Sequence, residues 1–449
     1  MQIYAYINLV EMRGGGGNTS PKLKLSNSQI AYLHDSNPSS FYSSCALPFY
    51  CTALFLLPVV LLPFTPFYAY IFGLFIMVGF SAYIPKNFRI LLSITLCLSI
   101  ALIYASRLYF NLATDSDDDF SRYYQNYLDV YDGLSGAMTL WGGGYEVGLP
   151  IFYKLLSILL PKLPPQYVLF CTALFATTLM YIWLEIYGQN FVTDKQKAAL
   201  IAFSLYIGVF METLGLTRQG LASIFLLYGF FAKPMHIKLL FFIIAASFHL
   251  SSIGIIALCY IAYYFPRLTL AVFVAFFIAF IIGASFINTH LVESATFLYK
   301  HFPSRIVEYI LHYVNANGYN PYYLIYTNIM KSIIMLCIVF TLFVITPNDT
   351  LLKRFRVVIL IAFVIYITNI IPGRSMMLVC DTLFCFIVFV VFRHFFHLTL
   401  VFFFPYFLKL MYNYLFSGDH PETRAMELFF SYPEASLYPF YYFFQGALL

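Results

Sequence analysis

The sequence predicts an all-α integral membrane protein. Of its 449 residues, 61% are hydrophobic, 20% are aromatic and only 10% are charged, and the mean hydropathy is +0.80. A soluble domain is about half apolar and a quarter charged, so a water-soluble fold of this composition would lack polar side chains to cover its core. Disorder needs low hydrophobicity, and a membrane barrel needs short alternating strands. A bundle of membrane helices remains.

Long apolar runs with short polar connections indicate how many times the chain crosses the bilayer. Twenty helical residues span about 30 Å, the thickness of the hydrocarbon core. Most runs are long enough, and the run 237–265 can divide at "SFHLSS", so we expect about 12 to 13 transmembrane helices. The runs are 45–63, 66–83, 88–108, 166–187, 197–216, 217–232, 237–265, 268–287, 322–346, 355–371, 375–393 and 396–416.

Lysine and arginine residues in the short connections predict the orientation, because such residues favour the cytoplasmic side. Only a divided run 237–265 keeps Arg267 on that side, so we prefer the divided form. Successive connections alternate between the two sides of the membrane. With the divided run, this alternation places two large loops, 109–165 and 288–321, on the extracytoplasmic face. The basic residues expected in the cytoplasm are Lys86, Arg89, Lys195, Lys197, Lys233, Lys238, Lys353, Arg354 and Arg356.

Composition divides the chain into three parts. Residues 1–42 are polar and contain a glycine run, which predicts a disordered extension. Residues 43–416 form the polytopic membrane domain, and residues 417–449 form an aromatic tail. The net charge of +5 is scattered over short loops and predicts no nucleic-acid partner. The eight cysteines lie in or beside apolar runs without zinc-type pairing, so we interpret them as small core residues.

The second half of the first outer loop has apolar residues at helical spacing. The segment 146–160 is followed by Pro161, Pro164 and Pro165, residues that end helices. This pattern predicts a short interfacial or re-entrant helix.

Arg218 is the most informative charged residue. It lies in "METLGLTRQGLASIF", between two apolar runs, where the chain should turn on the outer side. One interpretation is a charge that snorkels to the membrane interface. The other is an anion clamp, since a guanidinium offers a planar fork to phosphate oxygens.

Arg374, in "IIPGRSMML", has the same setting, and Arg305, in "FPSRIVEYI", lies in the second outer loop. Three arginines at the outer ends of spans indicate a polyanionic ligand such as a lipid pyrophosphate. Chance scatter of basic residues is the alternative.

Two residues are candidates for proton transfer. His249, in "AASFHLSSIG", is either a hydrogen-bonded structural residue or a general base on the same side as the arginines. Glu146, in "GGGYEVGLP", either stabilises the start of a helix or accepts a proton from a sugar hydroxyl. The residues leave both choices open.

An acidic and aromatic segment follows the third run. Carboxylates accept hydrogen bonds from sugar hydroxyls and aromatic rings pack on pyranose faces, so this segment is a candidate sugar-binding region. A solvated loop is the alternative, and no spacing defines a metal site. The candidate sugar-binding residues are Asp117, Asp118, Tyr123, Tyr124 and Tyr127.

These features, in this order, resemble the EpsG and Wzy group of bacterial polysaccharide polymerases over about residues 90 to 395. The resemblance rests on the acidic, tyrosine-rich outer loop and on "YEVG", "TRQGLA", "FHLSS" and "GRSMM". The long polar N-terminus and the aromatic tail depart from the family pattern. The residues that match are Asp117, Glu146, Arg218, His249 and Arg374, with Arg305 a weaker match.

The resemblance implies a fold like that of C-type membrane glycosyltransferases and a multi-pass enzyme of the bacterial inner membrane. Such an enzyme joins undecaprenyl-pyrophosphate-linked oligosaccharide repeat units on the periplasmic or outer face, without a cofactor. Arg218 and Arg374, aided by Arg305, would stabilise the leaving pyrophosphate, and Glu146 or His249 would be the base. The expected partners are membrane lipids, a flippase and a chain-length regulator. A glycan ligase or other membrane glycosyltransferase, and a flippase or exporter, are the alternatives.

Overall fold

The computed structural model describes residues 49–105, 119–206, 217–301, 356–362, 378 and 382–393. The chain divides into two units, Met1–Ala53 and Leu54–Leu449, and the first contributes only the start of helix α3 to the described residues. Every regular element in these ranges is a helix. The predicted all-α class is therefore confirmed for the described part of the chain.

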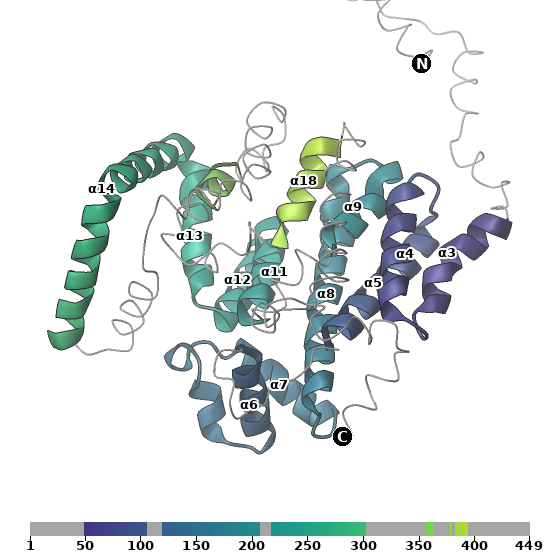
Figure 1. Cartoon of the computed structure of the whole chain (residues 1–449), viewed down its shortest axis with the longest axis horizontal. Helices are drawn as coiled ribbons and strands as arrows, with labels where there is room; N and C mark the ends of the chain where they lie inside the picture. Colours follow the sequence, from purple (N-terminus) through teal and green to yellow (C-terminus); the bar gives the residue numbers. More distant parts are fainter. Residues whose placement is uncertain are drawn as a thin grey trace, which may run out of the picture. The chain divides into compact units, whose positions relative to one another are not determined.

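Figure 1 shows the described helices in chain order from purple to yellow, and most of them lie within or over the predicted apolar runs. Two of them, α5 and α8, are long and apolar enough to cross a membrane, and α13 with the start of α14 makes a third candidate that is bent by 117°. The count of about 12 to 13 spans stays a prediction. The helices are α3 (Phe49–Leu61), α4 (Pro66–Gly79), α5 (Lys86–Ala105), α8 (Pro165–Ile186), α9 (Lys197–Ser204), α11 (Thr217–Phe231), α12 (Met235–Phe248), α13 (Ser251–Tyr264), α14 (Pro266–His301) and α18 (Phe384–Phe392).

Prolines mark where several helices begin. Helices α4, α8 and α14 each start on a proline, a residue whose missing N–H and fixed φ suit the first helical position. At α4 the preceding Thr65 also caps the helix, because its hydroxyl accepts a hydrogen bond from the Tyr68 N–H.

The run 237–265 forms two helices rather than one. Helix α12 ends at Phe248, α13 begins at Ser251, and His249 adopts an extended conformation between them. The predicted division at "SFHLSS" is confirmed. Helix α14 continues to His301, beyond the predicted border at residue 287, because no proline or glycine interrupts it between Gly283 and Pro303. The rest of the second outer loop lies outside the described residues.

Close helix packing forms the core. Helix α5 packs on α4 and α8, α8 packs on α11, and α11 packs on α12. Small residues allow this approach: a Cβ atom on Gly229 would lie 2.4 Å from the Phe242 ring, and one on Gly73 would lie 2.9 Å from Leu96. The packing fixes the relative direction of the helices, and hence which of their ends meet.

The connections that carry basic residues, between α4 and α5, between α8 and α9 and between α11 and α12, lie at one end of the bundle. We call this end the basic end. Ser81, after α4, donates a hydrogen bond of 2.7 Å to the Lys195 carbonyl, before α9. Phe231, at the end of α11 and two residues before Lys233, packs on Trp183 of α8, with ring centroids 5.0 Å apart. Connections that the sequence assigns to one side of the membrane therefore lie at one end of the bundle. Which side of the membrane this is stays a prediction.

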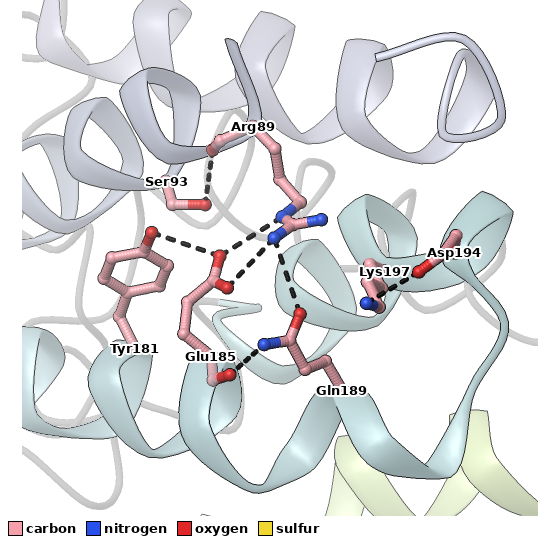
Figure 2. A network of polar contacts seen from close by, with 7 residues as sticks. All are labelled: Arg89, Ser93, Tyr181, Glu185, Gln189, Asp194 and Lys197. Atoms are coloured by element: carbon pink, nitrogen blue, oxygen red, sulfur yellow. Dashed lines mark hydrogen bonds and ion pairs between the residues drawn. The ribbon is translucent and has the colours of Figure 1, made fainter. Parts of the chain in front are cut away.

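Arg89 lies in a buried polar network at the basic end (Figure 2). Its Nε and Nη2 donate to the two carboxylate oxygens of Glu185 at 3.2 and 3.0 Å, and Nη2 also approaches the Gln189 amide oxygen at 3.4 Å. Tyr181 donates a further hydrogen bond to Glu185. Arg89 is only 8% exposed. Arg89 therefore connects α5 to α8. The sequence alone predicts only that this basic residue lies on the cytoplasmic side.

Candidate functional site at the opposite end of the bundle

A glycine turn places Glu146 immediately before helix α7 (Gly148–Leu159). Gly142, Gly143 and Gly144 have φ values of +54°, +67° and +93°, a region that side chains disfavour. A Cβ atom on Gly142 would lie 2.7 Å from Cγ of Glu146. The turn can therefore close over Glu146, which is only 4% exposed, because glycine occupies these positions.

A second glycine brings this turn to the junction of α12 and α13. A Cβ atom on Gly148 would lie 2.8 Å from the ring of Phe248, the last residue of α12. Helix α7 packs on α12, and also on α6 (Asp119–Tyr131) of the same outer loop. The helix observed over Gly148–Leu159 confirms the helix predicted for 146–160, whereas its interfacial or re-entrant position stays a prediction.

Glu146 joins three parts of the chain. Its Oε2 pairs with Nη1 of Arg218, in the first turn of α11. Its Oε1 accepts a hydrogen bond of 2.8 Å from the Leu250 N–H and lies 3.2 Å from Nδ1 of His249. Burial alone would raise the pKa of Glu146, but the contacts with His249 and Leu250 and the charge of Arg218 lower it overall. Glu146 is therefore a fixed carboxylate at neutral pH.

Arg218 lies against aromatic rings of the outer loop. Its guanidinium carbon is 4.0 Å from the ring centroid of Trp141 and 5.7 Å from that of Tyr123. The side chain is 18% exposed, and its buried Nε has no hydrogen-bond partner among the described residues.

His249 occupies the break between α12 and α13. Its Nδ1 lies within reach of both Glu146 Oε1 and the Ser251 N–H, at 3.2 and 3.3 Å. Nδ1 donates to Glu146 when it carries a proton and accepts from Ser251 when it does not. The side chain is 28% exposed. Both contacts involve Nδ1, and neither involves Nε2.

The structure brings together Glu146, Arg218, His249 and Tyr123 from the predicted set. Tyr124 and Tyr127 are buried nearby on α6, where their hydroxyls bond the Leu163 carbonyl at 3.2 Å and the Leu163 N–H at 2.9 Å. These bonds hold the loop together, and sugar binding by the two residues stays a prediction. Asp117, Asp118, Arg305 and Arg374 lie outside the described residues.

Trp141 is the site residue that sequence reasoning did not single out. The chain contains only two tryptophans, and Trp141 directly precedes the glycine turn in a polar loop. A tryptophan at that place is a signal that could have identified it.

We find no cluster of three or more histidine, cysteine, aspartate or glutamate side chains suited to a metal within the described ranges. The polar groups that do converge are a carboxylate, a guanidinium, an imidazole and two aromatic rings. This set can bind an anion and move a proton.

In its described part, the fold and the site define a helical protein with apolar helices of membrane-spanning length and, at the end opposite the basic end, a cluster of ionisable residues. The chain belongs to the EpsG family, whose family model matches residues 90–432. No curated protein and no solved structure matches it. Membership of the family indicates a glycosyltransferase-like polymerase of polysaccharide biosynthesis, associated with a membrane. All the residues of the cluster lie within the matched range.

Proposed function

We propose that the protein polymerises undecaprenyl-pyrophosphate-linked oligosaccharide repeat units into a surface polysaccharide. The observation that carries this proposal is the convergence of Arg218, Glu146 and His249, three groups from separate parts of the chain. Glycosyl transfer from a lipid pyrophosphate needs charge stabilised on the departing pyrophosphate and a proton removed from the acceptor hydroxyl. One group for each task lies in this cluster.

Arg218 is the group suited to the pyrophosphate. Its guanidinium stays charged at any physiological pH, and its planar fork matches phosphate oxygens. The ion pair with Glu146 uses Nη1, and Nε has no partner among the described residues. Because the side chain is 18% exposed, its guanidinium can still approach and stabilise the negative charge of the departing pyrophosphate.

His249 is better suited to be the base than Glu146. The Glu146 carboxylate is buried and already holds an arginine, a backbone N–H and an imidazole, contacts that lower its pKa and weaken it as a base. His249 is more exposed, and its Nε2 is directed by the contacts that Nδ1 makes. In this assignment Glu146 is a positioning residue that orients both the imidazole and the guanidinium.

In the proposed transfer step, one glycosidic bond forms as the bond to the pyrophosphate breaks. The acceptor hydroxyl oxygen forms a bond to the anomeric carbon of the donor sugar while the bond from that carbon to the pyrophosphate oxygen breaks. The electron pair leaves with the pyrophosphate, whose added charge Arg218 stabilises. The hydroxyl proton passes to Nε2 of His249 and from there to solvent.

The position of the cluster agrees with chemistry on the outer face of the inner membrane. It lies at the end of α11 opposite the basic end, and basic connections favour the cytoplasm. The lipid-linked donor would enter sideways from the bilayer. We include Arg374 and Arg305 as further pyrophosphate ligands and Asp117, Asp118 and Tyr123 as sugar contacts in this proposal. A flippase and a chain-length regulator are its proposed partners.

The test is polymerisation in vitro by the purified full-length protein in lipid nanodiscs. Donors are undecaprenyl-pyrophosphate oligosaccharides of several compositions, and products are separated by length. Elongation by the wild type, with loss of elongation in Arg218→Ala and retention in Lys154→Ala, supports the proposal. Lys154 is an exposed residue of α7, and its replacement controls for loss of a positive charge on the outer loop that carries Glu146.

Two other outcomes would replace this function with a different one. Transfer of preformed polymer to a lipid acceptor, without elongation, would identify a ligase. Movement of lipid-linked glycan across the bilayer, again without elongation, would identify a transporter.

A further inference from the structure

The indole of Trp141 lies against the guanidinium of Arg218. The guanidinium carbon is 4.0 Å from the Trp141 ring centroid, well within the range of a cation–π contact. Tyr123 stands beside them, with its ring centroid 5.6 Å from that of Trp141. Trp141 and Tyr123 come from the outer loop, whereas Arg218 comes from α11, so the contact joins two separate parts of the chain.

A comparison with Arg89 shows what this contact adds. Arg89 presents Nε and Nη2 to both oxygens of Glu185, and such a two-point contact fixes the plane of a guanidinium. Arg218 reaches Glu146 through Nη1 alone. A one-point contact fixes the position of the charge but leaves the guanidinium plane free to turn.

The Trp141 face supplies the second constraint. A flat ring whose centroid is 4.0 Å from the guanidinium carbon limits how far the guanidinium plane can turn. Nε of Arg218 is buried and has no partner among the described residues, whereas the side chain as a whole is 18% exposed. A guanidinium that is held in one orientation and is partly exposed suits the bidentate geometry that phosphate oxygens require.

We propose that Trp141 is a positioning residue that holds the plane of Arg218 for two-point binding of the substrate's diphosphate. This inference rests on the proposed function, because it assumes that Arg218 binds the departing pyrophosphate. Trp141 itself takes part in no bond that forms or breaks.

The first test compares Trp141→Phe and Trp141→Ala with Trp183→Phe in the nanodisc assay. Trp183 is the other tryptophan of the chain, and it packs among Phe231 and Phe386 near the basic end. Loss of a cation–π contact corresponds to about a 2- to 30-fold change. We expect that loss in kcat/KM for Trp141→Ala, a smaller loss for Trp141→Phe, and none for Trp183→Phe.

Inhibition separates positioning from general damage. Undecaprenyl diphosphate can bind the guanidinium at two points through its phosphate oxygens, whereas undecaprenol, which carries no phosphate, is the control for binding of the lipid chain. We expect Trp141→Ala to weaken inhibition by the diphosphate and to leave inhibition by undecaprenol unchanged, and Trp141→Phe to restore part of the inhibition by the diphosphate. Equal weakening of both inhibitors, or wild-type kcat/KM in Trp141→Ala, would overturn the proposal.

A spectroscopic test does not depend on activity or on the folding of Trp141→Ala. In Trp183→Phe protein, Trp141 is the single tryptophan and its emission reports the indole environment. Arg218→Lys should change the intensity and lifetime of this emission, because a lysine ammonium cannot stack as a plane. Lys154→Ala should not. Identical emission with arginine and lysine at position 218 would contradict the stacking.

These outcomes can be told apart from failure of the proposed function. If the wild type elongates no lipid-linked glycan, the proposed function fails, while the emission test still decides whether Trp141 holds Arg218. If the wild type elongates and Trp141→Ala does so equally well, only the role of Trp141 fails.

Discussion

The carboxylate of Glu146 pairs with the guanidinium of Arg218, although 72 residues separate them in the chain. The same carboxylate accepts the Leu250 N–H, which lies 104 residues from it. One buried side chain thus connects the outer loop, the start of α11 and the junction of α12 and α13.

Replacement of Arg218 should slow elongation strongly. Loss of a group that stabilises developing charge costs about 10²- to 10³-fold in rate. Arg218→Lys should restore little, because a lysine offers a point charge rather than a planar fork. Initial rates of elongation in nanodiscs measure the effect, with Lys154→Ala as the matched control. Wild-type rates in Arg218→Ala would remove Arg218 from the reaction.

Replacement of His249 should lower kcat and leave KM nearly unchanged. A general base contributes about 10²- to 10⁴-fold, and glutamine keeps hydrogen-bonding capacity without accepting the proton. The variant His249→Gln is compared with His236→Gln, which changes an exposed histidine at the start of α12. A higher KM with an unchanged kcat would show that His249 binds substrate and is not the base.

The lowered pKa of Glu146 predicts acid-sensitive stability. Because Glu146 binds its proton less tightly in the folded than in the unfolded protein, its contribution is complete above the unfolded pKa of about 4.3. That contribution is lost as the pH falls through the lower folded pKa. Thermal unfolding of purified protein should therefore show a smaller loss of Tm on acidification in Glu146→Gln than in the wild type. Exposed Glu293 supplies the control variant Glu293→Gln, and parallel curves for wild type and Glu146→Gln would refute this linkage.

Alanine at Gly142 should damage the site, whereas alanine at Gly136 should not. Gly142 combines a φ of +54° with a Cβ position 2.7 Å from Glu146, so the change costs about 1 to 3 kcal/mol of strain. At Gly143, with φ of +67° and no atom within 4 Å, only the backbone term applies. Gly136 has open space and no such φ. Elongation rate and Tm should rank Gly136→Ala above Gly143→Ala above Gly142→Ala, and any other order would count against the described turn.

The Arg89–Glu185 pair should matter for stability rather than for elongation. Removal of one partner leaves a buried charge and costs about 3 to 5 kcal/mol. Glu185→Ala should therefore lower the free energy of unfolding by about that amount, while the double variant Arg89→Met with Glu185→Leu should recover most of it.

The exposed pair Lys162–Asp132 gives the comparison for that experiment. Its side chains are 45% and 51% exposed, so Asp132→Ala should cost less than about 1 kcal/mol. Chemical denaturation in detergent measures both effects. Equal costs at the two pairs would mean that Arg89 and Glu185 are solvated in the protein.

Much of the site could be predicted from the sequence because its charges stand out in an apolar chain. Arg218 and His249 interrupt apolar runs, where an unpaired charge is costly, so their positions already indicated a function. The break between α12 and α13 was predictable because the polar residues of "SFHLSS" interrupt an apolar run.

What could not be predicted depends on contacts between distant segments. The contacts of Glu146 with Arg218 and His249 follow from the fold of the outer loop onto α11 and α12. Arg89 appeared to be a loop charge because its partner, Glu185, lies 96 residues away. Tyr124 and Tyr127 are of a residue type that is common in sugar-binding sites. Only their hydrogen bonds to Leu163 show that they also hold the loop together.

The contact between Glu146 and the Leu250 N–H has a consequence for assembly. The N–H that Glu146 accepts belongs to the turn that separates α12 from α13, so the outer loop completes that turn when it docks. Arg218 and His249 acquire their shared partner at the same moment. A newly inserted chain whose helices have formed but whose outer loop has not yet docked would therefore lack the arrangement on which the proposed function depends. Under that proposal, docking of the outer loop and assembly of the site are a single event.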